Sequence, residues 1–181
     1  MSLAGDQSVL AVLFPGLEGL LGEIRQRHDP AAAVGVPPHV TLIYPFLPPS
    51  AIDQPVLSGI AELTGSVQPF TATFRGLRRF PGCLCLDPDP ADPFVTMIKA
   101  LAGRFPDAPP YGGRHDSILP HLTFAAAETD AACDRLARDF GDGPGRALPV
   151  DHKVDEMALV TRQDGRWQTA RLFPLGRTRG D

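Results

Sequence analysis

The sequence has little of what marks a membrane-bound or secreted protein. No apolar run approaches the roughly 18 residues that a membrane-spanning helix requires. The amino-terminal stretch lacks both the basic segment and the long apolar core of a secretory signal peptide. We therefore expect a cytoplasmic protein that does not associate with a membrane.

Cysteine is scarce, and its spacing excludes two common structural devices. The chain has three cysteines, Cys83, Cys85 and Cys133. An odd count with one Cys-x-Cys pair makes no disulfide framework, and no further ligands stand at the spacing of a zinc site. Cys83 and Cys85 fall on one face of an expected strand. We interpret all three as ordinary core thiols.

An excess of basic charge is also missing. The 181 residues carry 17 Lys and Arg against 21 Asp and Glu, for a net charge of −4 and an isoelectric point near 5.7. A protein that grips a long nucleic acid by its phosphates is normally basic. Arginines gather at Arg75, Arg78 and Arg79, which we interpret as a solvated strand end. The charge therefore favours a small or short substrate.

What the chain does have is a pattern of strands and helices that occurs twice. With 43% hydrophobic and 21% charged residues, its composition is that of a soluble globular protein. Extended patterns predict strands at 9–14, 40–46, 70–77, 83–87, 121–127, 150–160 and 167–175. Apolar residues at helical spacing predict helices around 17–27, 56–67, 94–105 and 133–140. Asp92 is the expected N-cap of the third helix, and the sequence RQDGR predicts a hairpin between the last two strands.

This repeated order predicts an α+β fold in a single domain spanning residues 1–181. Two structurally similar lobes, with antiparallel sheets flanked by helices, would be related by approximate two-fold symmetry. Each lobe would contribute one short motif, around 39–42 and 121–124, to a central active-site groove. We expect the protein to be a monomer.

A Pro-His-x-Thr run stands on one predicted strand of each half. The first lies in PPHVTLIYPF and the second in LPHLTFAAA. With five histidines in the whole chain, two such runs at equivalent positions are poorly explained by chance. Alternate residues of a strand share a face, so His39 lies beside Thr41, and His121 lies beside Thr123. The apolar residues between and after them are expected to face the core: Val40, Leu42, Leu122 and Phe124.

Two histidines and two threonines that converge on one groove suit the cleavage of a phosphodiester. Near neutral pH, one histidine can accept a proton while the other donates one. The two hydroxyls can donate hydrogen bonds to non-bridging phosphate oxygens. The sequence suggests neither the paired carboxylates of a glycosidase nor a serine nucleophile with its own base. The residue types therefore favour acid–base cleavage without a metal ion.

The two motifs, HVTL and HLTF, resemble the paired signature of the 2H phosphoesterase superfamily. With the run PPYGG before the second motif, the chain is most similar to the bacterial 2′-5′ RNA ligase-like and cyclic phosphodiesterase branch, which has the LigT-like fold. The resemblance implies that His39 and His121 are the catalytic acid–base pair. It also implies that Thr41 and Thr123 bind the phosphate and that neither a metal nor an organic cofactor is required.

Three further residues are candidates for substrate binding. Tyr44 follows the first motif and is either a packed aromatic residue or a platform for a nucleobase. Tyr111 and Arg114 stand on the Gly-rich loop before the second motif. Loops beside a rigid site often carry specificity.

We predict a hydrolase that opens 2′,3′-cyclic phosphates or related small cyclic nucleotides, with a role in RNA processing. Its partner would be a small nucleotide or an RNA end. Reversible 2′-5′ ligation of RNA ends and a nucleotide- or RNA-binding module without turnover stay open as alternatives. A metal-dependent hydrolase that uses His39, His121 and His115 is a further one. The sequence does not assign the acid and base roles.

Overall fold

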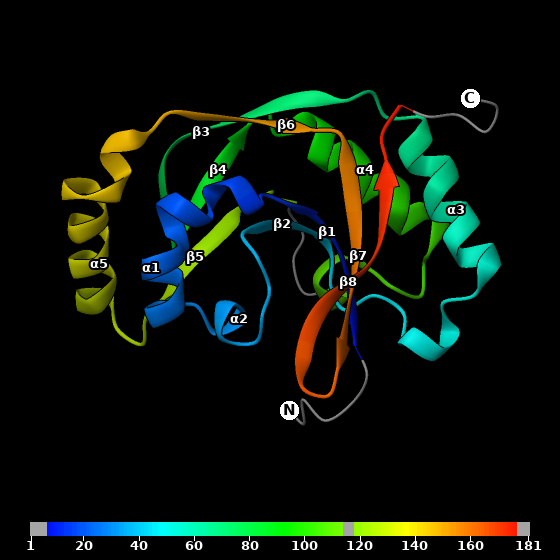
Figure 1. The fold of residues 1–181 in the computed structure, drawn as a ribbon, viewed down its shortest axis with the longest axis horizontal. Helices are drawn as coiled ribbons and strands as arrows, with labels where there is room; N and C mark the ends of the chain where they lie inside the picture. Colours follow the sequence, from blue (N-terminus) through cyan, green and yellow to red (C-terminus); the bar gives the residue numbers. More distant parts are fainter. Residues whose placement is uncertain (1–6, 114–117, 177–181) are drawn as a thin grey trace.

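The computed structural model describes residues 7–113 and 118–176, whose strands form two antiparallel sheets of four strands each (Figure 1). Sheet A has the order β2-β1-β7-β8, and sheet B has the order β5-β4-β3-β6. Sheet A consists of β1 (Ser8–Leu13), β2 (His39–Ile43), β7 (Glu156–Gln163) and β8 (Arg166–Pro174). Sheet B consists of β3 (Phe70–Phe80), β4 (Cys83–Asp89), β5 (Leu122–Ala126) and β6 (Val150–Val154). With the helices below, these sheets confirm the predicted α+β class.

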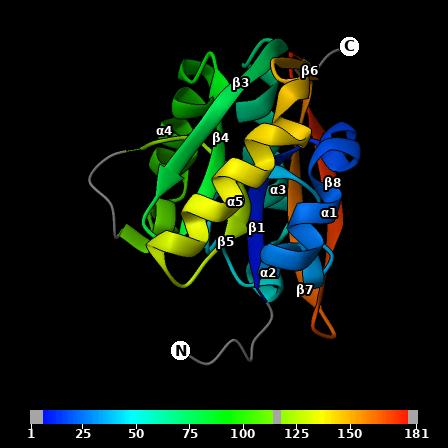
Figure 2. The same ribbon diagram turned by 90° about the vertical axis from the view of Figure 1, so that its left-hand side faces the viewer.

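Among the described residues, five helices cover the two sheets, and two of them pack against the sheet that does not contain their preceding strand. The five are α1 (Glu18–His28), α2 (Pro30–Ala33), α3 (Gln54–Gly65), α4 (Asp92–Arg104) and α5 (Asp130–Asp142). α1 follows β1 of sheet A but packs against β5 of sheet B, whereas α4 follows β4 of sheet B but packs against β2 of sheet A. α5 lies beside α1 on sheet B, and α3 lies along β8 (Figures 1 and 2). Within the described ranges, no helix is long and apolar enough to cross a membrane.

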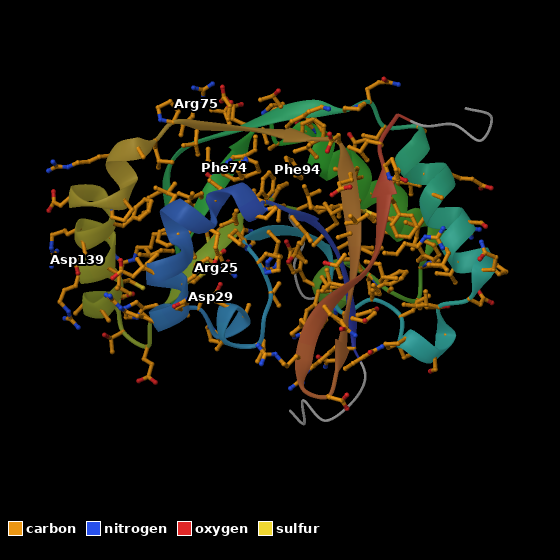
Figure 3. All side chains as sticks on the ribbon, viewed as in Figure 1. Arg25, Asp29, Phe74, Arg75, Phe94 and Asp139 are labelled. Carbon is orange, nitrogen blue, oxygen red and sulfur yellow. The ribbon has the colours of Figure 1, made fainter. Side chains whose placement is uncertain are left out.

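One continuous apolar core joins the two sheets. Val40 and Leu42 of the first motif strand are fully buried in it, as are Leu122 and Phe124 of the second. Phe74 of β3, labelled in Figure 3, belongs to the same core. Burying a large apolar side chain contributes about 1.5–3 kcal/mol. Both motif strands are therefore anchored by their inner faces, as the alternation of their residues predicts.

The predicted N-cap of α4 is wrong by one residue. Ala91 occupies the N-cap position without a side-chain hydrogen bond, and Asp92 is the first residue of the helix. A carboxylate in the first turn interacts favourably with the helix dipole, so Asp92 supports the helix start without capping it. Asp53 and Thr129 are side-chain caps, because they accept the backbone N–H of residues 56 and 132 at 3.0 and 3.2 Å.

The segment predicted as one strand over 150–160 is two strands in different sheets. β6 pairs with β3, where Val154 lies opposite Phe70. β7 pairs with β1, where Ala158 lies opposite Ala11. Asp155 separates the two strands at the point where the chain crosses from sheet B to sheet A. The local pattern predicts extended backbone in both parts but carries no information about the partner strand.

The predicted hairpin between the last two strands is confirmed. Asp164 and Gly165 have φ angles of 49° and 81°. Two consecutive residues with positive φ form a type I′ turn, whose twist matches that of the flanking strands. This turn sets the register of β7 against β8, in which Gln163 lies opposite Arg166.

Candidate active site

The two motif strands lie next to each other where the sheets meet. β2 is an edge strand of sheet A, β5 is an edge strand of sheet B, and the two contact each other. His39 and Thr41 are half-buried on β2, and His121, directly before β5, and Thr123 of β5 are also half-buried. Charge on His121 influences the pKa of His39, so the two imidazoles are close enough to interact. We call these four residues the paired-motif site.

Both motif strands carry a β-bulge at the same place. In β2 the extra residue is Leu42, directly after Thr41. In β5 the extra residue is Phe124, directly after Thr123. A bulge bends its strand and changes the direction of the neighbouring side chains. The two halves of the site are therefore shaped by the same backbone device.

The two imidazoles are also held by the same hydrogen bond. Nδ1 of His39 donates to the carbonyl of Pro37 at 2.9 Å, and Nδ1 of His121 donates to the carbonyl of Leu119 at 2.7 Å. A backbone carbonyl can only accept, so Nδ1 carries the hydrogen in each ring. The lone pair of a neutral imidazole is then on Nε2. Each histidine is oriented to exchange a proton through Nε2.

A buried ion pair holds the loop that leads into the first motif. Arg25 of α1, which is 1% exposed, donates from Nε to Asp29 at 3.0 Å and from Nη2 to the carbonyl of Val36 at 2.8 Å. Asp29, which is 7% exposed, also accepts the backbone N–H of Ala31 at 2.9 Å. Figure 3 labels both charged residues beside α1 and α2. These bonds tie α1 to the segment immediately before His39.

The surroundings of His39 disfavour its charged form. Burial is the largest cause that lowers its pKa below the ordinary value of 6.5. The hydrogen bond to Pro37 opposes this effect, whereas the Arg25 cation and a positive charge on His121 lower the pKa of His39 further. The nearby carboxylate of Asp29 raises the pKa in part. The net effect favours the neutral ring, with Nε2 free of a proton.

We expect His39 to make the protein less stable in mild acid. Because the pKa of His39 is lower in the folded state, the unfolded chain binds a proton that the folded chain does not between the two pKa values. The free energy of unfolding should therefore fall as the pH drops below 6.5, by up to about 1.4 kcal/mol per pH unit in that window. Urea unfolding at about pH 7.5 and about pH 5 measures this loss, which should be smaller in His39→Gln. An equal loss in both proteins would contradict the prediction.

Aromatic rings flank His121. The Phe80 ring lies 5.0 Å from the imidazole, centroid to centroid, at an interplanar angle of 55°. The Tyr111 ring is nearly parallel to the imidazole, at 6.4 Å and 10°. The guanidinium of Arg78 lies 5.7 Å from the Phe80 ring and donates to Asp87 at 2.5 Å. The second half of the site is therefore lined by aromatic surface.

Tyr111 is held in an uncommon backbone conformation. Its φ is 53°, and Gly112 and Gly113 follow with φ of 63° and 73°. A non-glycine residue in this left-handed region costs on the order of 1 kcal/mol, and such strain is concentrated at functional sites. The segment Pro110–Gly113 also contacts β2. Burial raises the pKa of Tyr111, so its phenol stays protonated and can donate a hydrogen bond.

The sequence prediction missed a contact between a thiol and one motif threonine. Sγ of Cys85 lies 3.4 Å from Oγ1 of Thr123 and 3.8 Å from Sγ of Cys83. Burial raises the pKa of Cys85 to about 12, so it stays a thiol and not a thiolate. Cys85 is buried as expected of a core thiol. The contact of Cys85 with Thr123 depends on the register of β4 against β5, which no local sequence pattern reveals.

Tyr44, another predicted substrate-binding residue, has its described contacts outside the paired-motif site. The Tyr44 hydroxyl donates to Gln7 at 3.0 Å, and its ring lies 6.1 Å from that of Trp167. Both rings pack on a small apolar cluster, separate from the main core, formed by Val9, Ala11, Ala158 and Val160. Arg114 and His115 lie outside the described residues.

The arginine cluster of β3 is matched by acidic residues. Arg75 pairs with Asp89 at 2.9 Å. Arg78 pairs with Asp87, as described above, and Arg79 pairs with two carboxylates of α5, one of them Asp130 at 3.0 Å. These pairs are exposed, so each contributes about 0–1 kcal/mol. The cluster therefore carries little net positive charge.

Among residues 7–113 and 118–176, no group of three or more His, Cys, Asp and Glu side chains is placed to hold a metal ion. A hollow of about 650 Å³ lies between α1 and α5, where Leu20, Arg27 and Phe140 contribute to its wall. It includes none of the four motif residues.

The sequence matches one family model and resembles several phosphoesterase-named relatives. The chain matches the model of the 2′-5′ RNA ligase superfamily over residues 14–166, which contain both motifs. A Bacillus licheniformis protein named "Putative phosphoesterase" is 26% identical over 176 residues, covering 91% of this chain and 96% of the relative. A Bacillus pumilus protein of the same name is 27% identical over 175 residues, covering 91% and 95%. The predicted resemblance is confirmed.

Solved structures share the fold over nearly their whole length. A protein of Thermus thermophilus superposes with a TM-score of 0.64 at 20% identity, covering 94% of this chain and 98% of the other. Escherichia coli LigT, solved in complex with 3′-AMP, has a TM-score of 0.57 at 16% identity, with coverage of 95% and 99%. The family model over residues 14–166 makes the chain a member of the 2′-5′ RNA ligase superfamily, and the structural matches show that it has the LigT-like fold.

Proposed function

We propose that the protein is a metal-independent phosphoesterase that hydrolyses 2′,3′-cyclic phosphates or related small cyclic nucleotides to monoesters. The observation that carries this proposal is the duplicated arrangement of His39 and His121. Each imidazole has Nδ1 bonded to the carbonyl two residues earlier and Nε2 left for proton exchange. Each also lies two residues from a threonine on the same side of its strand.

The chemistry follows from the groups at the site. One imidazole accepts a proton from water as it attacks phosphorus, and the other donates a proton to the departing ribose oxygen. Thr41 and Thr123 donate hydrogen bonds to the non-bridging oxygens, where negative charge increases in the transition state. The contact between Cys85 and Thr123 helps to orient that hydroxyl. None of these steps requires a metal ion.

Three observations support a small nucleotide as the substrate. The arginines of β3 are paired with carboxylates, and the net charge of the chain is −4. Neither provides the basic track that a long RNA would require. In addition, E. coli LigT has been solved with NADP+, with 3′-AMP and with ATP, so a protein of this fold accommodates nucleotides.

Incubation of the purified protein with the four nucleoside 2′,3′-cyclic phosphates tests the proposal. We expect conversion to a 2′- or 3′-monophosphate, measured by chromatography, at a rate that excess chelator does not change. Saturable binding without any product would instead support a binding module. Loss of activity in chelator would contradict the metal-independent route. Joining of tRNA halves under the same conditions, without hydrolysis of the cyclic nucleotides, would support the ligase alternative.

A further inference from the structure

Two thiols stand side by side on β4, next to one threonine of the paired-motif site. Cys83 and Cys85 are alternate residues of the strand, so their side chains share a face. Sγ of Cys83 lies 3.8 Å from Sγ of Cys85, and Sγ of Cys85 lies 3.4 Å from Oγ1 of Thr123. A row of three polar atoms therefore leads from Cys83 to a hydroxyl that we propose binds the phosphate.

We propose that Cys83 and Cys85 bind a thiol-binding divalent cation of the Zn²⁺ class, and that the bound ion inhibits hydrolysis by drawing the Thr123 hydroxyl away from the phosphate. The effect on turnover rests on the proposed function, whereas the binding of the ion does not. The ion is an inhibitor and not a cofactor, so this site is compatible with a metal-independent reaction.

The separation of the two sulfurs suits chelation of one ion. Zinc–thiolate bonds are about 2.3 Å long, so two thiolates of a tetrahedral zinc ion stand about 3.8 Å apart. The sulfurs of Cys83 and Cys85 already have this separation. Thiolates bind Zn²⁺ in preference to Mg²⁺ or Ca²⁺, which prefer oxygen ligands. The chain supplies two ligands and water supplies the others, so the site is reversible, unlike a structural zinc site with four protein ligands.

The surroundings of the pair allow a cation to approach from the side of Cys83. Cys83 is half-buried, whereas Cys85 is buried. Ala126 lies opposite Cys83 on β5, so the flank of Cys83 toward that strand carries only a methyl group. Asp87 is the next residue on the same face of β4, and its negative charge acts on Cys85. A nearby carboxylate favours a cation over an anion at this position.

The effect on Thr123 follows from the conversion of a thiol to a thiolate. Without the ion, Cys85 can donate its S–H to Oγ1 of Thr123, which leaves the hydroxyl proton of Thr123 for the phosphate. A thiol that coordinates a metal ion loses its proton, so its sulfur can only accept. At the same contact, the hydroxyl of Thr123 then donates to the sulfur. The phosphate thereby loses one of its two threonine donors.

The binding step is balanced. Two bonds form between sulfur and the ion, two water molecules leave the ion, and each thiol releases one proton to solvent. No electron is transferred, so neither an oxidant nor a reductant is required. The two thiolates cancel the charge of the ion, so the ion brings no net positive charge to replace the lost donor.

Titration with Co²⁺, a coloured substitute for Zn²⁺, tests the site without reference to activity. The protein is kept reduced and is stripped of metal before the titration. We expect a sulfur-to-cobalt charge-transfer band that saturates at one ion per chain, release of about two protons per ion, and loss of the band when Zn²⁺ is added.

Cysteine variants locate the bound ion. Cys83→Ser and Cys85→Ser should each lose the cobalt band. Cys133→Ala is the matched control, because Cys133 is the third thiol of the chain and is buried on α5; this variant should keep the band. Absence of the band in the wild type, or an unchanged band in Cys83→Ser, would overturn the proposal.

The link to Thr123 is tested by turnover of a nucleoside 2′,3′-cyclic phosphate. Saturating Zn²⁺ should slow the wild type by about 10²-fold, the loss expected when one donor to a non-bridging oxygen is removed. Chelator should restore the rate. The ratio of the rates with and without Zn²⁺ is compared within each protein, so a change in the basal rate cancels. This ratio should be near one in Cys83→Ser and equal to that of the wild type in Cys133→Ala.

The other outcomes are distinguishable. Equal inhibition of the wild type and Cys83→Ser would show that Zn²⁺ acts at another site, such as the motif histidines, and would contradict the proposal. A cobalt band in the wild type without inhibition by Zn²⁺ would contradict the link to Thr123. Absence of turnover by the metal-free wild type would overturn the proposed function, and the cobalt titration would still decide whether the two thiols bind the ion.

Discussion

Alanine in place of either His39 or His121 should reduce kcat for a 2′,3′-cyclic nucleotide by about 10²- to 10⁴-fold. General acid and general base catalysis each contribute an acceleration of this size, and each imidazole is oriented through the same Nδ1 bond for that purpose. The two histidines act in one transition state. The loss of kcat in the double variant should therefore be smaller than the product of the two single losses. Steady-state kinetics on the three variants measures these effects.

His28→Ala is the matched control for the histidine variants. His28 is the last residue of α1 and is half-buried, but it is not part of either motif. Replacing His28 should leave kcat within about two-fold of wild type. Substitutions at partly exposed positions outside the motifs and the buried ion pair change little. Circular dichroism would establish that the slow variants remain folded. Activity near that of the wild type in either His39→Ala or His121→Ala would show that the paired-histidine mechanism is wrong.

Removing the carboxylate of Asp29 should destabilise the protein by about 3–5 kcal/mol, the usual cost of leaving one partner of a buried ion pair without the other. Asp29→Ala would leave the guanidinium of Arg25 buried at 1% exposure. Glu18 also pairs with Arg25, at 3.5 Å. Because Glu18 is 49% exposed, its carboxylate is a weak substitute for that of Asp29. Urea unfolding at about pH 7.5 measures the loss. Because the same pair holds the loop before His39, folded Asp29→Ala should also have a lower kcat.

The pair formed by Glu23 and Arg27 is the matched control for the buried one. It has the same spacing of four residues on the same helix, but its side chains are 81% and 66% exposed. Exposed pairs of this kind contribute about 0.3–0.5 kcal/mol. Glu23→Ala should therefore change the free energy of unfolding by no more than that. Equal losses in Asp29→Ala and Glu23→Ala would contradict the role assigned to the buried pair.

Local sequence patterns determined which residues of the motif strands are buried and which are presented. The alternation in HVTL and HLTF places Val40 and Leu122 in the core, where both are fully buried. A period of two residues is a property of the extended backbone itself, so it holds whatever the strand pairs with. The Asp164–Gly165 turn was predictable for a similar reason, since its positive φ angles are a local preference of that pair.

Tertiary structure alone decided what surrounds those residues. Strand pairing places Cys85 against Thr123, splits the segment around Asp155 between two sheets, and puts an extra residue after each motif threonine. Chain folding also brings Arg25 to one histidine and Phe80 to the other. These contacts join residues that are far apart in the sequence, and no local preference encodes them. The repeated motifs thus indicate two equivalent histidines, and only the long-range contacts make them different.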